Sequence, residues 1–139
     1  MIEKIQKDIQ TNLRKYNQEL VEIKPQEMLT WGYEKFDNQF AITTSFGIQS
    51  SVLLDMVSKL RLQKKIKIFW IDTGYLPPET YHYAEKLIKN LSLEVEVLQS
   101  ELSPARMEAL YGKLWETNKA SDLDKYCLLY TSPSPRDDL

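Results

Sequence analysis

Two short polar segments of this sequence suit the binding of an anionic ligand. The first reads Thr44-Ser45-Phe46-Gly47-Ile48-Gln49-Ser50-Ser51. A strand that leads through a small residue and a glycine into a helix exposes backbone N–H groups, and the helix N-terminus adds a positive field. The serine hydroxyls can donate further bonds, so the segment suits phosphate or sulfate. It is neither a P-loop nor a G-x-G-x-x-G motif, and an ordinary strand-to-helix turn with a serine cap has the same pattern.

The second segment, Asp72-Thr73-Gly74-Tyr75, follows the next apolar run. Asp72 could accept hydrogen bonds from sugar hydroxyls or a base amine, and Gly74 would let the backbone approach a flat ligand. A helix-capping aspartate with a turn glycine is the structural alternative. Ligands of open parallel sheets bind beyond the carboxyl ends of the strands, so two such segments after successive strands would reinforce one another.

Cysteine and histidine occur once each, as Cys127 and His82. One cysteine cannot form an internal disulfide or a four-cysteine metal or cluster site. We therefore expect no metal site and no bound cofactor, and a reducing, cytoplasmic location. His82 is expected to face solvent on the helix after the second segment, because nothing marks a catalytic partner for it.

The charge balance narrows the classes of partner. The formal net charge is −2, with 27% charged residues, so no global basic excess points to nucleic acid or an anionic membrane. Residues 1–7 have charges threaded through them and no apolar core of signal-peptide length. The apolar stretches are too short to cross a bilayer. The composition leaves the oligomeric state, including a homodimer, open.

The surrounding pattern predicts alternating helices and strands. Apolar residues recur at helical spacing over residues 2–20, and Pro25 suits the first turn of a second helix. Strands are expected at residues 40–44, 66–71 and 93–98, the last nearer an edge, with helices from Gln49, Glu79 and Ser103. The buried face expected for the Gln49 helix comprises Val52, Leu53, Met56, Val57 and Leu60. This order predicts an α/β fold whose mostly parallel sheet has right-handed crossovers and flanking helices.

Three regions are expected along the chain. Residues 1–37 form an N-terminal helical segment, and residues 38–126 form a partial α/β domain that contains both polar segments. Residues 127–139 are rich in serine, proline and charge, so we expect a disordered tail. We also expect this tail to be non-native, because it departs from the family resemblance described below.

Three motifs in this order give the sequence a family resemblance. Residues 43–51 resemble the modified PP-loop of assimilatory 3′-phosphoadenylyl-sulfate (PAPS) reductases, and residues 71–81 resemble their second signature. The run Tyr111-Gly112-Lys113-Leu114-Trp115-Glu116 resembles a third, typical of the PAPS-using branch. The resemblance implies an adenine-nucleotide α-hydrolase-like (PP-loop) fold, here incomplete. It also implies reduction of PAPS to sulfite and adenosine 3′,5′-bisphosphate, with thioredoxin as electron donor.

The resemblance implies a nucleotide site at the residues that match the family's motifs. It does not supply a nucleophile, because the family's cysteine motif does not occur in this sequence. The substrate-binding residues that it implies are Ser45, Phe46, Gly47, Gln49, Ser50, Ser51, Asp72, Thr73 and Gly74. The family nucleophile is a cysteine in a Glu-Cys-Gly-x-His motif, whereas Cys127 is followed by Leu128-Leu129-Tyr130. No catalytic residue is therefore assigned. We expect a truncated enzyme, inactive alone, whose thioredoxin contacts need the missing C-terminal part.

Three alternatives stay open at this point. An enzyme that cleaves ATP between its α and β phosphates would carry Ser-Gly-Gly-x-Asp-Ser, and residues 45–50 lack the second glycine and the aspartate. An adenylyl-sulfate reductase would hold an iron–sulfur cluster on paired cysteines beyond this region. A non-catalytic nucleotide-binding module is the third.

Overall fold

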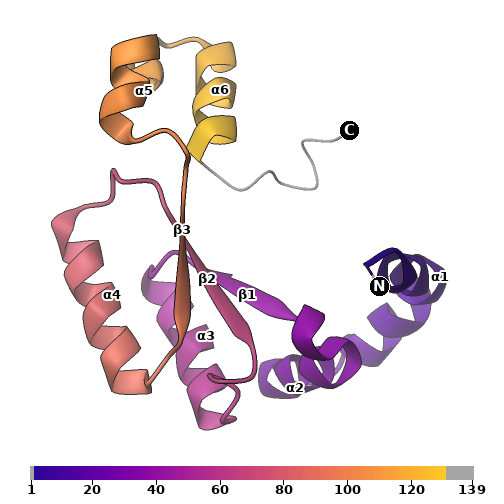
Figure 1. Ribbon diagram of the computed structural model, residues 1–139. Coiled ribbons are helices and arrows are strands. Elements are labelled where there is room, and N and C mark those ends of the chain that lie inside the picture. Colours follow the sequence, from indigo (N-terminus) through magenta and orange to yellow (C-terminus); the bar gives the residue numbers. More distant parts are fainter. Residues whose placement is uncertain (1, 131–139) are drawn as a thin grey trace.

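The computed structural model describes residues 2–130, and it alternates helices with three strands (Figure 1). Its elements are α1 (Ile2–Leu20), α2 (Pro25–Phe36), η1 (Asp37–Gln39), β1 (Ala41–Thr44), α3 (Ile48–Lys59), β2 (Lys67–Asp72), α4 (Pro78–Leu91), β3 (Val95–Gln99), α5 (Pro104–Tyr111), η2 (Leu114–Glu116) and α6 (Ala120–Tyr130).

The three strands form one parallel sheet in the order β1-β2-β3, which confirms the predicted α/β architecture. Thr44 pairs with Trp70, and Asp72 pairs with Gln99. The connections β1–α3–β2 and β2–α4–β3 step across the sheet in the same direction. Helices α3 and α4 therefore cover one face, and α1 lies on the other side of the sheet from α4 (Figure 1).

The main core lies between this covered face and the helices α3 and α4. Ile68 and Trp70 of β2 point into it, as does Leu54 of α3, each with 4% or less of its surface exposed. The prediction of the buried face of α3 was wrong in part. Val57 is buried, but Val52 is 55% exposed. Positions 52 and 57 lie about 140° apart around a helix, so the stripe through Leu54 and Val57 leaves Val52 outside.

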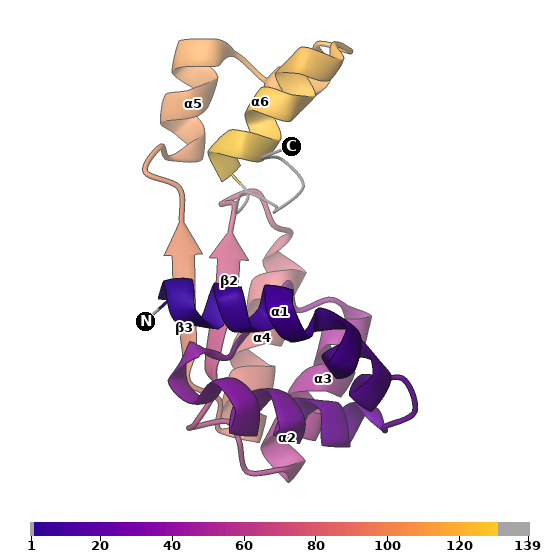
Figure 2. The ribbon, with the colours of Figure 1, turned by 90° about the vertical axis from the view of Figure 1, so that its right-hand side faces the viewer.

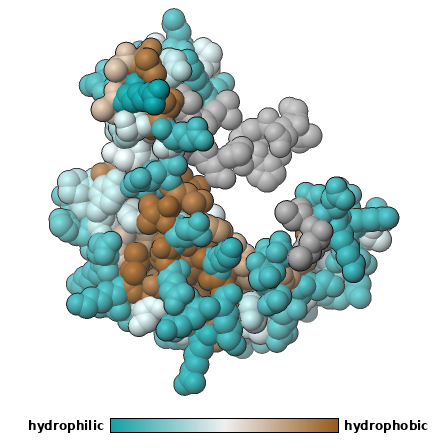
Figure 3. All heavy atoms as spheres, in the orientation of Figure 1, coloured by the Kyte–Doolittle hydropathy of each residue, from teal (hydrophilic) through white to brown (hydrophobic). Residues whose placement is uncertain are grey.

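The sheet's other face carries exposed apolar side chains. Figure 3 shows hydrophobic residues gathered over the strands and a hollow between them and α1. On β3, an edge strand, Leu98 pairs with Ile71 on this face and is 41% exposed. Among residues 2–130, no helix is both long and apolar enough to cross a membrane.

A small helical unit, residues 104–126, stands beyond the carboxyl ends of β2 and β3 (Figures 1 and 2). The Ser103 hydroxyl accepts the Arg106 N–H, which confirms the predicted start of α5. Met107 and Leu114 form the unit's own core with Trp115 and Tyr126.

Helix α6 was not predicted. It runs from Ala120 to Tyr130, and so continues past the boundary expected at residue 127. Residues 131–139 lie outside the described part of the chain, and the prediction of a disordered tail there stays a prediction.

Candidate functional site

The first polar segment connects β1 to α3 and exposes the start of that helix. Gly47 is the N-cap residue, and its carbonyl accepts the N–H groups of Ser50 at 3.0 Å and Ser51 at 3.4 Å. The N–H groups of Ile48 and Gln49 lie too early in the helix to reach a carbonyl one turn before them. Because Gly47 has no side chain to cap them, these donors remain for an external acceptor, reinforced by the helix dipole.

Two serine hydroxyls stand beside these amides. The Oγ atoms of Ser45 and Ser50 lie 3.5 Å apart. Both residues line an open cavity of about 390 Å³, together with Gly47, Ile48 and Gln49. Backbone donors and hydroxyls therefore converge on one small polar cavity, which we call the anion loop (residues 45–51).

Ser51 faces a different space from Ser45 and Ser50. Its hydroxyl donates to the Ile48 carbonyl at 2.6 Å. It also lines a second cavity, of about 380 Å³, between the anion loop and the start of α4. That cavity includes Glu79, whose carboxylate makes it less suited to an anion than the first.

Phe46 anchors the anion loop to the core. Its side chain is 3% exposed and meets the Trp70 ring edge-to-face, with centroids 4.8 Å apart. Its φ is 54°, and its N–H donates to the Thr44 hydroxyl at 3.1 Å. What Phe46 offers a ligand is therefore backbone, because the ring is turned inward.

The second polar segment is organised by Asp72, whose carboxylate is 8% exposed. Its Oδ1 accepts the Gly74 N–H at 2.8 Å and the Tyr81 hydroxyl at 2.7 Å, and its Oδ2 accepts the Gln99 side-chain amide at 3.0 Å. Burial alone would raise the pKa of Asp72, but these three donors outweigh it and hold that pKa below its usual value. A charged Asp72 therefore fixes the segment, which we call the Asp72 loop (residues 72–77).

The exposed surface of the Asp72 loop is mostly backbone. Gly74 has a φ of 74° and is exposed, while Thr73 is half-buried. The Thr73 hydroxyl accepts the Tyr75 N–H at 3.3 Å, which tightens the turn further.

Both loops leave the sheet at the carboxyl ends of its strands, as predicted, because β1 and β2 run parallel with Thr44 beside Trp70. Aromatic rings join them beneath the surface. Phe46 contacts Trp70, the Trp70 and Tyr81 centroids lie 5.7 Å apart, and the Tyr81 hydroxyl bonds to Asp72. Within residues 2–130, the buried Nε1 of Trp70 makes no hydrogen bond.

Comparison with known proteins decides the family. The sequence model of the family described as phosphoadenosine phosphosulfate reductase domain matches residues 39–131. This chain belongs to that family. It is 44% identical over 115 residues to a phosphoadenosine 5′-phosphosulfate reductase of Synechococcus sp., covering 83% of this chain and 49% of that protein. A protein of the same name from Synechocystis sp. is 46% identical over 108 residues, covering 78% of this chain and 43% of that one.

A solved structure supports the same assignment. The phosphoadenylyl-sulfate (PAPS) reductase from Candida auris, crystallised as a phosphate complex, superposes with a TM-score of 0.71 and 31% identity. The match covers 87% of this chain and 57% of that one. The chain thus spans about half the length of the curated relatives described above.

The third motif of the PAPS reductase resemblance lies in the helical unit, where its Trp115 ring meets Tyr75 of the Asp72 loop with centroids 4.9 Å apart. Leu114 is 4% exposed, and the Trp115 ring packs against Tyr126 with centroids 5.4 Å apart. Lys113 and Glu116 pair with each other at 3.4 Å on the surface. In this structure the motif packs the helical unit.

Two residues of the site were missed from the sequence. Tyr81 lies within the second motif, but its bond to Asp72 depends on the position of α4. The role of Gln99 could be predicted only from the pairing of β2 with β3, because this pairing places Gln99 beside Asp72. Both donate to the Asp72 carboxylate, so they shape the Asp72 loop from below.

The other chemically capable side chains do not form a second site. His82 is exposed on α4, and the side chain of Cys127 lies outside the described residues. Within the described part of the chain, no group of three or more His, Cys, Asp or Glu side chains is placed to hold a metal ion.

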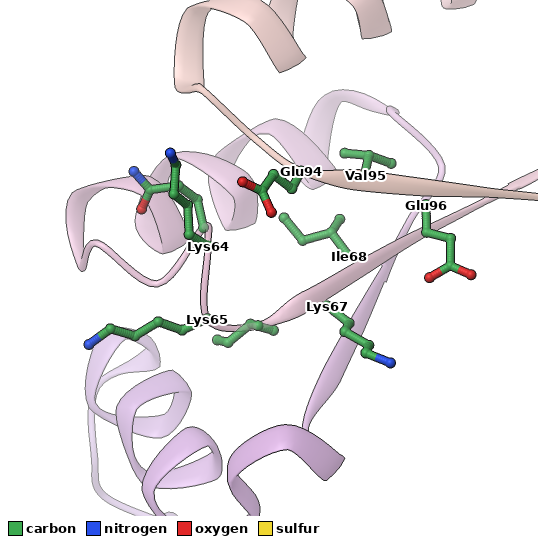
Figure 4. A pocket seen from close by; sticks show the side chains of 9 residues that line it. Lys64, Lys65, Lys67, Ile68, Glu94, Val95 and Glu96 are labelled. Carbon is green, nitrogen blue, oxygen red and sulfur yellow. The ribbon is translucent and has the colours of Figure 1, made fainter.

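A larger cavity, of about 680 Å³, lies at the opposite end of the sheet, where β2 and β3 begin. Its charged side chains diverge: Figure 4 shows the ends of Lys65 and Lys67 pointing away from each other. We therefore place the candidate site at the two loops.

Proposed function

We propose that this chain forms the nucleotide-binding portion of a PAPS reductase and binds PAPS and adenosine 3′,5′-bisphosphate. The observation that carries the proposal is the anion loop. Uncapped amides at the start of α3 and the hydroxyls of Ser45 and Ser50 line one cavity. Such a set of donors matches the geometry and charge of a phosphate or sulfate group.

The second loop would receive the nucleoside. With the Asp72 carboxylate engaged by Gly74, Tyr81 and Gln99, the ligand contacts fall to the backbone of Thr73 and Gly74. The roles of Phe46 and Gly47 are likewise backbone roles, and Gln49 also lines the cavity. Ser51, which bonds back to Ile48, would support the helix start more than the ligand.

The proposed whole reaction reduces PAPS to sulfite and adenosine 3′,5′-bisphosphate. A cysteine thiolate attacks the sulfonyl sulfur, the S–O bond to the nucleotide breaks, and a thioredoxin dithiol then releases sulfite from the cysteine adduct. The 139 residues contain no Glu-Cys-Gly-x-His motif. We propose that they contribute ligand binding to this reaction and not its nucleophile. A reducing compartment, the cytoplasm, suits this thiol chemistry.

Calorimetric titration with adenosine 3′,5′-bisphosphate tests the binding proposal. We expect weak but saturable binding, which Ser45→Ala and Ser50→Ala each reduce by about twofold to tenfold, the worth of one hydrogen bond. Ser121→Ala, at an exposed position on α6, should leave the affinity unchanged. The proposal fails if the unmodified chain gives no saturable heat, or if all three variants bind alike. Thioredoxin-dependent sulfite release by this chain would refute the assigned division of roles.

A further inference from the structure

Tyr75 ties the Asp72 loop to the helical unit. Its hydroxyl donates to Glu108 Oε1 at 2.8 Å and lies 3.3 Å from the Pro104 carbonyl oxygen, both on α5. Its ring meets Trp115 edge-to-face, with centroids 4.9 Å apart, and packs against the core formed by Met107 and Leu114. One side chain from the loop thus completes the core of a unit that begins 29 residues later in the chain.

Steric contact at the neighbouring residue reinforces this link. A Cβ atom added to Gly74 would lie 2.6 Å from Pro104 Cγ. The loop backbone and the first turn of α5 are therefore in close contact, so that neither can shift toward the other. A displacement of α5 would change the position of Gly74 and of the N–H that it donates to Asp72.

The helical unit has little other support from the α/β body. Figures 1 and 2 show α5 and α6 standing beyond the ends of β2 and β3, and the unit's core is separate from the main one. Apart from the covalent connection through residues 100–103, the contacts described above run through the Asp72 loop. The unit's position and the loop's conformation are thus mechanically linked.

We propose that Tyr75, held by Glu108, is a positioning residue that couples nucleotide binding at the Asp72 loop to the order of the helical unit. This inference rests on the proposed function. Coupling between two sites is reciprocal. Nucleotide bound at the loop therefore stabilises α5, and loosening α5 lowers the nucleotide affinity by the same factor. Glu108 acts through Tyr75 and need not touch the ligand.

Amide hydrogen exchange by NMR, with and without saturating adenosine 3′,5′-bisphosphate, tests the coupling. In the unmodified chain, the nucleotide is expected to protect the Ser50 and Gly74 amides by stabilising the loop hydrogen bonds that they donate to Gly47 and Asp72. It should also protect the Met107 amide, which donates to the Ser103 carbonyl in α5. Protection at Ser50 without any at Met107 would overturn the coupling while leaving the proposed function standing. Protection at none of the three would refute both.

Three variants assign the coupling to the Tyr75 hydroxyl. Tyr75→Phe keeps the ring contacts and should weaken nucleotide affinity about threefold to tenfold, with protection lost at Met107 and retained at Ser50. Glu108→Ala should behave alike, whereas Glu108→Gln retains an acceptor oxygen and should restore most of the affinity. The control is Glu85→Ala, at an exposed position on α4. Unchanged affinity and unchanged Met107 protection in Tyr75→Phe would contradict the proposal.

Discussion

Replacing Gly74 with alanine is expected to destabilise the chain by about 2–5 kcal/mol. A φ of 74° costs a residue with a side chain roughly 1–2 kcal/mol. Overpacking against Pro104, which the new Cβ would approach to 2.6 Å, adds about 1–3 kcal/mol. Against a typical stability of about 5–15 kcal/mol, urea unfolding should show a large fall in the midpoint.

A double-mutant cycle separates the steric part of the Gly74→Ala cost from the backbone part. Pro104→Ala removes the Cγ and Cδ atoms that the new Cβ would meet. The cost of Gly74→Ala should therefore fall by about 1–3 kcal/mol in the Pro104→Ala background. Gly112→Ala is the matched control, because Gly112 also has a positive φ, of 72°, but nothing lies within 4 Å of an added Cβ. Equal costs in both backgrounds would mean that α5 does not abut the loop.

Asp72→Ala is expected to cost about 3 kcal/mol and to abolish measurable nucleotide binding. It would leave the Gly74 N–H, the Tyr81 hydroxyl and the Gln99 amide without their acceptor. Each unsatisfied donor costs about 1–3 kcal/mol when water cannot replace the lost partner. Chemical unfolding and calorimetric titration measure the two effects.

Asp72→Asn is the matched variant for the Asp72 carboxylate. Its amide oxygen can still accept from Gly74 and Tyr81, and rotation of the Gln99 amide can present an acceptor to the new NH₂ group. The loss should be about 1 kcal/mol, the difference between charge-assisted and neutral hydrogen bonds. An Asn variant as damaged as the Ala variant would show that the negative charge, and not the acceptor geometry, is what the loop requires.

The lowered pKa of Asp72 also sets a pH dependence. Since its hydrogen bonds favour the charged form in the folded state, their contribution is full above about pH 4 and declines as pH falls through the folded-state pKa. The stability difference between the unmodified chain and Asp72→Asn should therefore shrink in acid. Urea unfolding of both chains from pH 7 to pH 3 measures this, and a constant difference would contradict it.

Much of the α/β body could be read from local signals. Short β-branched runs and the Gly47 and Pro25 positions locate strands and helix starts, and strand–helix alternation implies the parallel sheet. Once the strands are parallel, the two polar segments must lie at the same end of the sheet, beyond the carboxyl ends of the strands. The helix start that exposes the Ile48 and Gln49 amides follows from the same local reasoning.

The parts that escaped prediction depend on contacts between distant residues. The Asp72 carboxylate reads as a ligand group in sequence but is satisfied by Tyr81 and Gln99, 9 and 27 residues away. Val52 fits an apolar stripe, yet the packing of α3 is set by Leu54. Tyr75 looks like a loop residue, and only the position of α5 reveals its partner, 33 residues on.

An NMR titration of the ¹⁵N-labelled chain with adenosine 3′,5′-bisphosphate tests the central claim most directly. The amides of Ile48, Gln49 and Ser50 should shift together with those of Thr73 and Gly74, following one binding curve. Amides lining the lysine-bearing cavity at the other end of the sheet, such as Lys64 and Glu94, should stay unchanged. Shifts confined to one loop, or centred on that distant cavity, would contradict a single nucleotide site at the carboxyl edge of the sheet.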